Sequence, residues 1–82
     1  MINLKYSLVI EATEDPEFFA FYSPELEGFS GVGHSIEECL MKARMGMDEH
    51  LQLLKRGDLP VPPINPNPTV TVQNSERIVP GA

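Results

Sequence analysis

The sequence has very little cysteine and no long apolar run, and both absences limit what the chain can be. Cys39 is the single cysteine among 82 residues, so the chain has neither a disulfide framework nor a thiolate cluster for zinc. No stretch approaches the ~20 apolar residues of a membrane span, and the first residues lack the apolar region and cleavage site of a secretory signal. We therefore expect a cytoplasmic protein that does not associate with a membrane.

Basic residues are also scarce, with six Lys and Arg against twelve Asp and Glu, for a net charge of −6. No Lys or Arg lies between Tyr6 and Met41. The carboxylates of that segment are Glu11, Glu14, Asp15, Glu17, Glu25, Glu27, Glu37 and Glu38. Such a surface repels phosphate backbones and attracts basic proteins, so we expect no direct contact with nucleic acid. A solvated acidic surface without any partner is the alternative.

Alternation of apolar and polar residues with period two predicts four strands, at residues 4–12, 18–22, 29–34 and 69–73. The first two are separated by turn residues and a proline, which is typical of a hairpin. Gly31 and Gly33 in the third strand indicate a bulge or a close backbone approach. In the second strand apolar residues alternate onto both faces, so we expect something to cover the outer face of the sheet.

A helix is predicted over residues 36–55, because Ser35 and Glu38 have the spacing of a capping box. Its predicted buried stripe consists of Ile36, Leu40, Ala43, Met47, Leu51 and Leu54, flanked by Cys39 and Gly46. Gly57 is predicted to stop the helix in a left-handed conformation. Five prolines between residues 59 and 68 then predict an extended, semi-rigid connector.

This element order predicts an α+β fold: a two-layer β-β-β-α-β unit with a three-stranded antiparallel meander, a fourth strand and one helix packed on one face. We expect a single domain over residues 1–73, a flexible tail over residues 74–82, and no DNA-binding domain. A chain of 82 residues is close to the size at which one core is barely sufficient, which favours a homodimer or tetramer.

Candidate reactive groups are few, and each has a structural explanation. We expect His34 to be a partly exposed turn residue and His50 to lie at the edge of the helix stripe. Glu37 and Glu38 are adjacent on a helix, so their side chains point about 100° apart and cannot share a proton-transfer step. Two histidines and one cysteine without ligand spacing favour neither a metal site nor another cofactor site. We predict no catalytic residue.

Candidate partner-binding residues come from two features of the sequence. Met41 and Met45 lie four residues apart on the polar side of the helix, where flexible apolar pairs often mark an adaptable contact surface. The second feature is the acidic half, from which we select Glu14, Asp15, Glu17 and Glu25. Ordinary exposed methionines are the alternative for the first pair.

Residues 6–11 and 21–40 resemble HicB-type antitoxins. The shared features are the first strand, a Pro-x-Leu-x-Gly turn beginning at Pro24, the Ser35 to Glu38 cap, and a proline-rich stretch followed by a short strand. The resemblance implies a partly degraded ribonuclease H-like fold without catalytic acids, which agrees with Leu8 and Val9 in the middle of the first strand. Cys39 departs from the alanine usual at its position.

The same resemblance implies a partner: HicA, a small basic toxin that cleaves messenger RNA. The sequence therefore predicts a non-catalytic, antitoxin-like protein that covers the active surface of a small basic ribonuclease. Two other interpretations stay open. One is a structural or regulatory homo-oligomer without a toxin partner, and the other is an enzyme, such as a residual nuclease.

Overall fold

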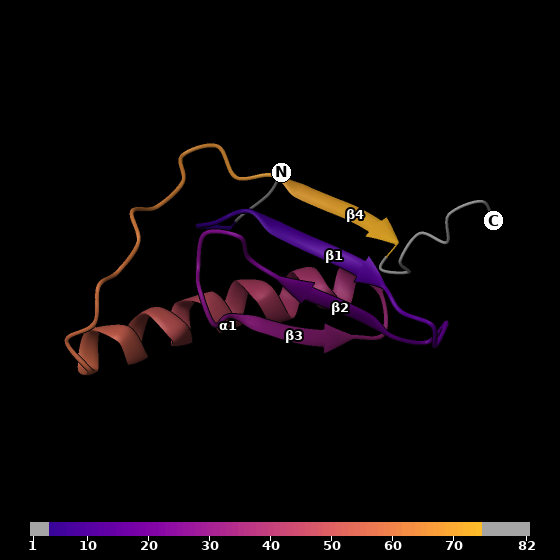
Figure 1. Cartoon of the computed structure of the whole chain (residues 1–82), viewed down its shortest axis with the longest axis horizontal. Coiled ribbons are helices and arrows are strands. Elements are labelled where there is room, and N and C mark those ends of the chain that lie inside the picture. Colours follow the sequence, from indigo (N-terminus) through magenta and orange to yellow (C-terminus); the bar gives the residue numbers. More distant parts are fainter. Residues whose placement is uncertain (1–3, 75–82) are drawn as a thin grey trace, which may run out of the picture.

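The fold is a four-stranded sheet with one helix packed against one of its faces (Figure 1). The computed structural model describes residues 4–74. In chain order the elements are β1 (Leu8–Ala12), β2 (Phe19–Tyr22), β3 (Ser30–Gly33), α1 (Ile36–Arg56) and β4 (Val70–Asn74). β1, β2 and β3 form an antiparallel meander, while β4 pairs in parallel with β1, giving the order β3-β2-β1-β4. The predicted α+β architecture is confirmed.

The first strand begins later than the alternation predicts. β1 starts at Leu8, although Tyr6 is completely buried and continues the apolar face toward the amino end. Ser7 does not continue the strand, because its polar groups have other partners. Its N–H donates to Glu25 Oε1 at 2.8 Å, and its Oγ accepts from the Thr69 N–H at 2.9 Å. Asn74, the first residue of the predicted tail, belongs to β4, and residues 75–82 of that tail lie outside the described residues.

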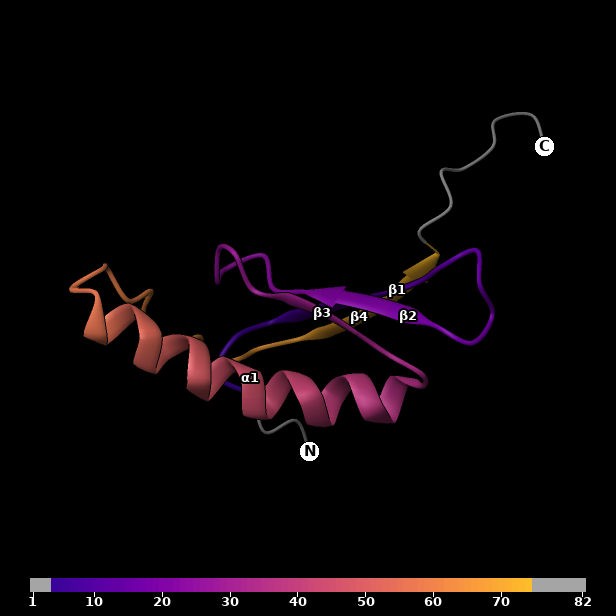
Figure 2. The ribbon, with the colours of Figure 1, turned by 90° about the horizontal axis from the view of Figure 1, so that it is seen from below.

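The face of the sheet toward α1 forms the core. Leu8, Ile10 and Phe21 are buried there, and Ile10 lies opposite Phe21 in the register of β1 and β2. Figure 2 shows α1 running beneath this face and extending past the sheet at its carboxyl end. Burying these side chains away from water is the main stabilising contribution of such a small domain.

The opposite face of the sheet is apolar as well, as the sequence predicts for β2. Val9 lies opposite Tyr22, and Ala20 lies opposite Val32. Tyr22 and Val32 are 40% and 53% exposed. Within residues 4–74 no helix packs on this face (Figure 2).

Glycines in β3 allow the helix and the neighbouring strand to approach closely. A Cβ atom at Gly31 would lie 2.5 Å from Cζ of Phe21, and one at Gly33 would lie 2.9 Å from Sγ of Cys39. The pairing of β2 with β3 is continuous from Phe19–Gly33 to Tyr22–Ser30, without a bulge. Of the two explanations offered by the sequence, close approach is therefore the one that applies.

The buried row of α1 differs from the predicted stripe. Cys39, Ala43, Met47 and Leu51 are buried, four residues apart along one line of the helix. Ile36, predicted to belong to the stripe, is 37% exposed. The stripe is rotated toward Cys39 because Gly33 leaves room for its sulfur against the sheet.

Both ends of α1 are capped, but the carboxyl end differs from the prediction. At the amino end Ser35 Oγ accepts a 3.0 Å hydrogen bond from the N–H of Glu38, as expected of the N-cap. At the carboxyl end Gly57 has φ −88°, so the prediction of a left-handed glycine is wrong. Asp58 takes that conformation instead, with φ 56°.

The proline connector, residues 59–68, runs from the end of α1 out around the molecule and back to β4 (Figure 1). Hydrogen bonds hold it near both ends. Leu59 N–H donates to Leu54 O at 2.8 Å, Tyr6 Oη donates to Pro62 O at 2.6 Å, and Asn65 N–H donates to Lys5 O at 2.9 Å. The predicted extended connector is confirmed, and it is tied to the residues that precede β1.

Candidate functional site

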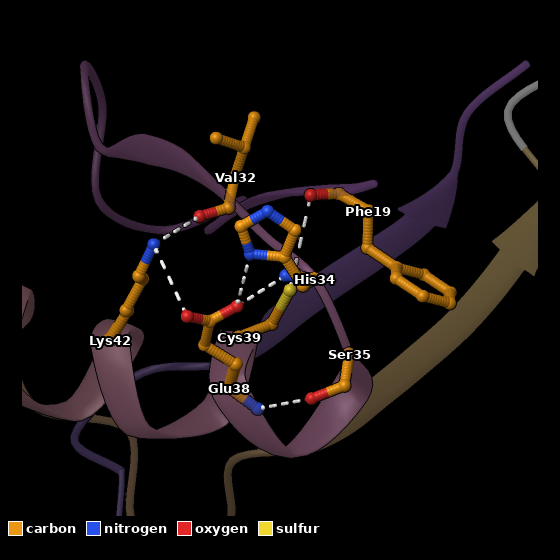
Figure 3. A network of polar contacts seen from close by, with 7 residues as sticks. All are labelled: Phe19, Val32, His34, Ser35, Glu38, Cys39 and Lys42. Carbon is orange, nitrogen blue, oxygen red and sulfur yellow. Dashed lines mark hydrogen bonds and ion pairs between the residues drawn. The ribbon is translucent and has the colours of Figure 1, made fainter. Parts of the chain in front are cut away.

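His34 belongs to a polar network that joins the end of β3 to the first turn of α1 (Figure 3). Its Nδ1 lies 3.0 Å from Glu38 Oε1, and its backbone N–H donates to the same oxygen. Lys42 Nζ lies 3.8 Å from Glu38 Oε2 and donates to the carbonyl of Val32 at 3.0 Å. The backbone hydrogen bond from His34, followed by the one from its ring, lowers the pKa of Glu38 below its ordinary value.

The contacts of this network are those of a structural element. The Glu38 carboxylate reaches the N–H of His34, one residue before the N-cap, while its own N–H is capped by Ser35. β3 is an edge strand, and Lys42 donates a hydrogen bond to one of its carbonyls. This contact protects β3 from pairing with a strand of another molecule. Of the predicted capping box, the hydrogen bond from Glu38 N–H to Ser35 is confirmed, whereas the Glu38 carboxylate accepts from the N–H of His34 and not from that of Ser35.

Cys39 is completely buried between α1 and β2. Its Sγ lies 4.0 Å from the carbonyl oxygen of Phe19 (Figure 3), and burial raises the pKa of the thiol above its ordinary value. The thiolate is the nucleophilic form of cysteine, and a raised pKa disfavours it. Cys39 therefore acts as a small apolar side chain in the core.

The described residues offer no evident metal centre or membrane segment. Within residues 4–74 no three His, Cys, Asp or Glu side chains gather in a way that could hold a metal ion. No helix in the same stretch combines the length and apolar character needed to cross a lipid bilayer.

Acidic residues from two distant parts of the sequence meet at one end of the molecule. Glu14, Asp15 and Glu17 lie in the turn between β1 and β2, and Glu37 and Glu38 lie in the first turn of α1. Figures 1 and 2 place this turn and the start of α1 at the same end of the fold. We call these five residues the acidic end.

A ring contact and a fixed turn hold the two parts of the acidic end together. The rings of Phe18 and His34 have centroids 4.9 Å apart, which ties the β1–β2 turn to the residue before the N-cap. Thr13 Oγ1 donates to the carbonyls of Asp15 and Phe18, and the N–H of Glu17 donates to Asp15 Oδ1 at 2.9 Å. The acidic end therefore consists of two segments that are distant in the sequence and held at one end of the fold.

The two candidate methionines adjoin the acidic end along the helix. Met41 and Met45 are 52% and 57% exposed. They follow Glu37 at intervals of four residues, and Glu49 follows at the same interval, so the four side chains form one row on the solvent side of α1. The methionine pair thus lies between acidic residues, next to the acidic end.

Glu25 does not belong to this surface. It lies in the turn between β2 and β3, at the other end of β2 from the acidic end. Its Oε1 accepts from the N–H of Ser7 at 2.8 Å, and its Oε2 accepts from Asn65 Nδ2 at 2.7 Å. The candidate residues therefore fall into three groups: the turn acids at one end of the fold, the methionine row of α1 that starts at the same end, and Glu25, whose contacts are structural.

A pocket that the sequence did not indicate lies beneath the proline connector. Its volume is about 580 Å³, and it is bounded by the β2–β3 turn, the last turns of α1 and the connector. Its walls include Leu26, Leu54, Leu59 and Val61 together with Pro60, Pro62 and Pro63, and Glu25 and Glu27 are its charged lining residues. The prolines indicate an extended chain. They do not indicate that Tyr6, which is distant in the sequence, donates a hydrogen bond to Pro62 in the wall of this pocket.

No family model, no curated protein and no solved structure matches this chain. The resemblance to HicB-type antitoxins rests on the sequence motifs alone.

Proposed function

We propose that this chain is a non-catalytic binding domain that holds a basic partner protein against the acidic end and the methionine pair. The observation that carries the proposal is the contact between Phe18 and His34, at 4.9 Å between ring centroids, which joins two acidic segments into one surface. A concentrated negative field of this kind accelerates association with positively charged proteins.

The methionine pair gives this surface an apolar component. Met41 and Met45 are more than half exposed, beside Glu37 on one side and Glu49 on the other. Methionine is unbranched and polarisable, so it adapts to a partner surface without a fixed shape. The combination suits a partner that presents Lys or Arg around an apolar patch.

The class of partner follows from the resemblance in sequence. We propose that the partner is a small basic RNA-cleaving toxin of the HicA type, and that binding covers its active surface. The absence of nucleic-acid contacts by this chain, and its cytoplasmic location, belong to the same proposal. The buried Cys39 and the structural use of Glu38 support a non-catalytic role.

Co-purification tests the proposal directly. The chain, co-expressed with a tagged small basic protein encoded by the adjacent reading frame, should form a stable complex and rescue growth. Glu17→Gln and Glu37→Gln should each weaken the complex up to about fivefold, with the largest effect at low salt. Asp58→Asn also removes one negative charge, but it lies beyond the far end of α1 and serves as the matched control.

Two results would count against this function. Equal weakening by all three variants would mean that total charge matters and the acidic end does not. Metal-dependent cleavage of RNA by the highly purified protein, abolished by one substitution, would replace the binding function by an enzymatic one.

The apolar outer face of the sheet favours a second candidate, a homo-oligomer whose assembly is its function. Tyr22 and Val32 are substantially exposed there, and a second copy could cover them. Light scattering would then report a defined dimer or tetramer of the isolated protein, and Val32→Lys would reduce its mass. A monomer at high concentration would exclude this alternative.

A further inference from the structure

The pocket beneath the proline connector has the lining of a site for a cationic side chain. Its volume of about 580 Å³ lies in the range of protein pockets that bind small ligands, roughly 300–1,000 Å³. Two acidic residues, Glu25 and Glu27, are part of the lining, and no Lys, Arg or His is.

The backbone around this pocket adds further hydrogen-bond acceptors and few donors. Pro60, Pro62 and Pro63 have carbonyl oxygens but no N–H groups, and the carbonyl of Pro62 already accepts from Tyr6 Oη. The N–H of Leu59 is already used, because it donates to Leu54 O at 2.8 Å. A ligand that brings several donors therefore matches the lining, and one that brings acceptors does not.

The remaining walls are apolar. Leu26 is buried at the base, and Leu54 is half-buried at the end of α1. Leu59 and Val61 are 54% and 39% exposed on the connector. Arg and Lys carry aliphatic stems that pack on such surfaces while their charged heads reach a polar partner.

Hydrogen bonds hold two lining residues of the pocket, Pro62 and Glu25, in place. Tyr6 Oη holds Pro62 O at 2.6 Å, and Asn65 Nδ2 holds Glu25 Oε2 at 2.7 Å. Ser7 and Asn65 thereby orient Glu25, whereas the Glu27 side chain makes no hydrogen bond within residues 4–74. A pre-formed site loses less entropy on binding than one that must be ordered.

We infer that this pocket binds an Arg or Lys side chain, flanked by an apolar residue, from an extended segment of a partner protein. The cationic head lies against the carboxylates of Glu25 and Glu27, and the stem packs on Leu54 and Leu59. This site lies at the opposite end of β2 from the acidic end, so the inference does not require the acidic end to bind anything.

A pair of short peptides tests the charge requirement. Acetyl-Ala-Leu-Arg-Leu-Ala-amide is titrated into ¹⁵N-labelled protein, beside the same peptide with citrulline, which keeps the shape of arginine without its charge. The arginine peptide should shift the amide signals of Leu26, Glu27, Leu59 and Val61. It should bind about three- to tenfold more tightly than the citrulline peptide, as expected for a partly desolvated ion pair.

Variants of the protein separate this pocket from a general charge effect. Glu27→Gln should weaken binding of the arginine peptide and so reduce its advantage over the citrulline peptide, whose binding should stay unchanged. Glu17→Gln removes a carboxylate of the acidic end and should leave both peptides unchanged. The undisturbed amide spectrum of each variant would confirm that it folds.

Three results would overturn the inference: equal affinity for the two peptides, shifts that map to the acidic end, or no shift at millimolar peptide. None of them bears on binding of a toxin by the acidic end, and loss of that binding leaves the peptide result intact.

Discussion

The ring of Phe21 lies so close to Gly31 that a Cβ atom at position 31 would be 2.5 Å from Cζ of that ring. Phe21 is 4% exposed and packs against Phe29, so it has little room to move away. We expect Gly31→Ala to lower the free energy of unfolding by about 1–3 kcal/mol through overpacking. Chemical denaturation measures this, and a variant as stable as the native protein would contradict the close approach.

At the end of α1, two substitutions should stabilise the protein, in contrast to Gly31→Ala. Gly57 has φ −88°, and a Cβ there would meet its nearest atom at 3.5 Å, so Gly57→Ala should stabilise the protein by about 0.4–1 kcal/mol by restricting the unfolded chain. Asp58 has φ 56° and places a negative charge at the negative end of the helix dipole.

Asp58→Gly should therefore also stabilise the protein, by up to about 1 kcal/mol, because it relieves the left-handed strain. Thermal unfolding of both single variants measures these changes. Destabilisation by Gly57→Ala would show that position 57, and not position 58, requires a left-handed residue.

Removing the carboxylate of Glu25 should destabilise the fold. Its two oxygens accept from Ser7 N–H and Asn65 Nδ2, and Ser7 is buried. Loss of an acceptor for a buried N–H costs about 1–3 kcal/mol, so Glu25→Ala should lower the denaturation midpoint accordingly. Glu27→Ala is the matched control in the same turn and should change stability little; equal effects of the two would contradict a structural role for Glu25.

The hydrogen bond between Tyr6 and Pro62 predicts a loss of stability at alkaline pH. Burial raises the pKa of the Tyr6 phenol above its ordinary value, an effect that Lys5 opposes and Glu25 reinforces. The stability from this neutral phenol is full below about pH 10, the ordinary pKa of tyrosine, and is lost as the pH rises toward the native pKa.

Tyr6→Phe should cost about 0.5–1.5 kcal/mol at neutral pH by removing the hydrogen bond to the connector. It should also show a smaller loss of stability above about pH 10 than the native protein, because the titrating group is gone. Urea unfolding at neutral and alkaline pH measures both effects, and parallel pH profiles would exclude Tyr6 as the cause.

Glu38 gives the corresponding prediction on the acid side. The backbone N–H of His34, then its ring and the charge of Lys42, lower the pKa of Glu38 from 4.5. Stability from the ionised carboxylate is present above this ordinary pKa and is lost as the pH falls toward the native pKa. The stability of the Glu38→Gln variant should therefore depend less on pH, between neutral and acid conditions, than that of the native protein. A pH profile of Glu38→Gln that matches the native profile would exclude Glu38 as the cause.

The sequence predicted those parts of the fold that local patterns determine. The alternation in β2 and β4, the Ser35 cap and the length of α1 all follow from interactions within a few residues. The start of β1 did not, because Ser7 leaves the ladder for partners 18 and 62 residues away. The rotation of the helix stripe toward Cys39 likewise depends on Gly33, which lies on another element.

The candidate site was predicted in composition but not in arrangement. The sequence identified Glu14, Asp15 and Glu17 as acidic, and it assigned Glu37 and Glu38 to the helix start. The pairing of Phe19 with Gly33 at the end of the β2–β3 ladder, together with the contact between Phe18 and His34, brings the two groups to one end. Glu25 carries the same charge as the other acidic candidates, and no local pattern indicates that Ser7 and Asn65 occupy its oxygens.

The parallel pairing of β4 with β1 sets a limit on when the protein can complete its fold during synthesis. The register joins Leu8 to Val70 and Ala12 to Asn74, so a central strand that is made early has no second neighbour until residues 70–74 have been made. Until then its exposed ladder groups are open to pairing with other chains. A nascent chain arrested before residue 70 should thus be the form most in need of a chaperone.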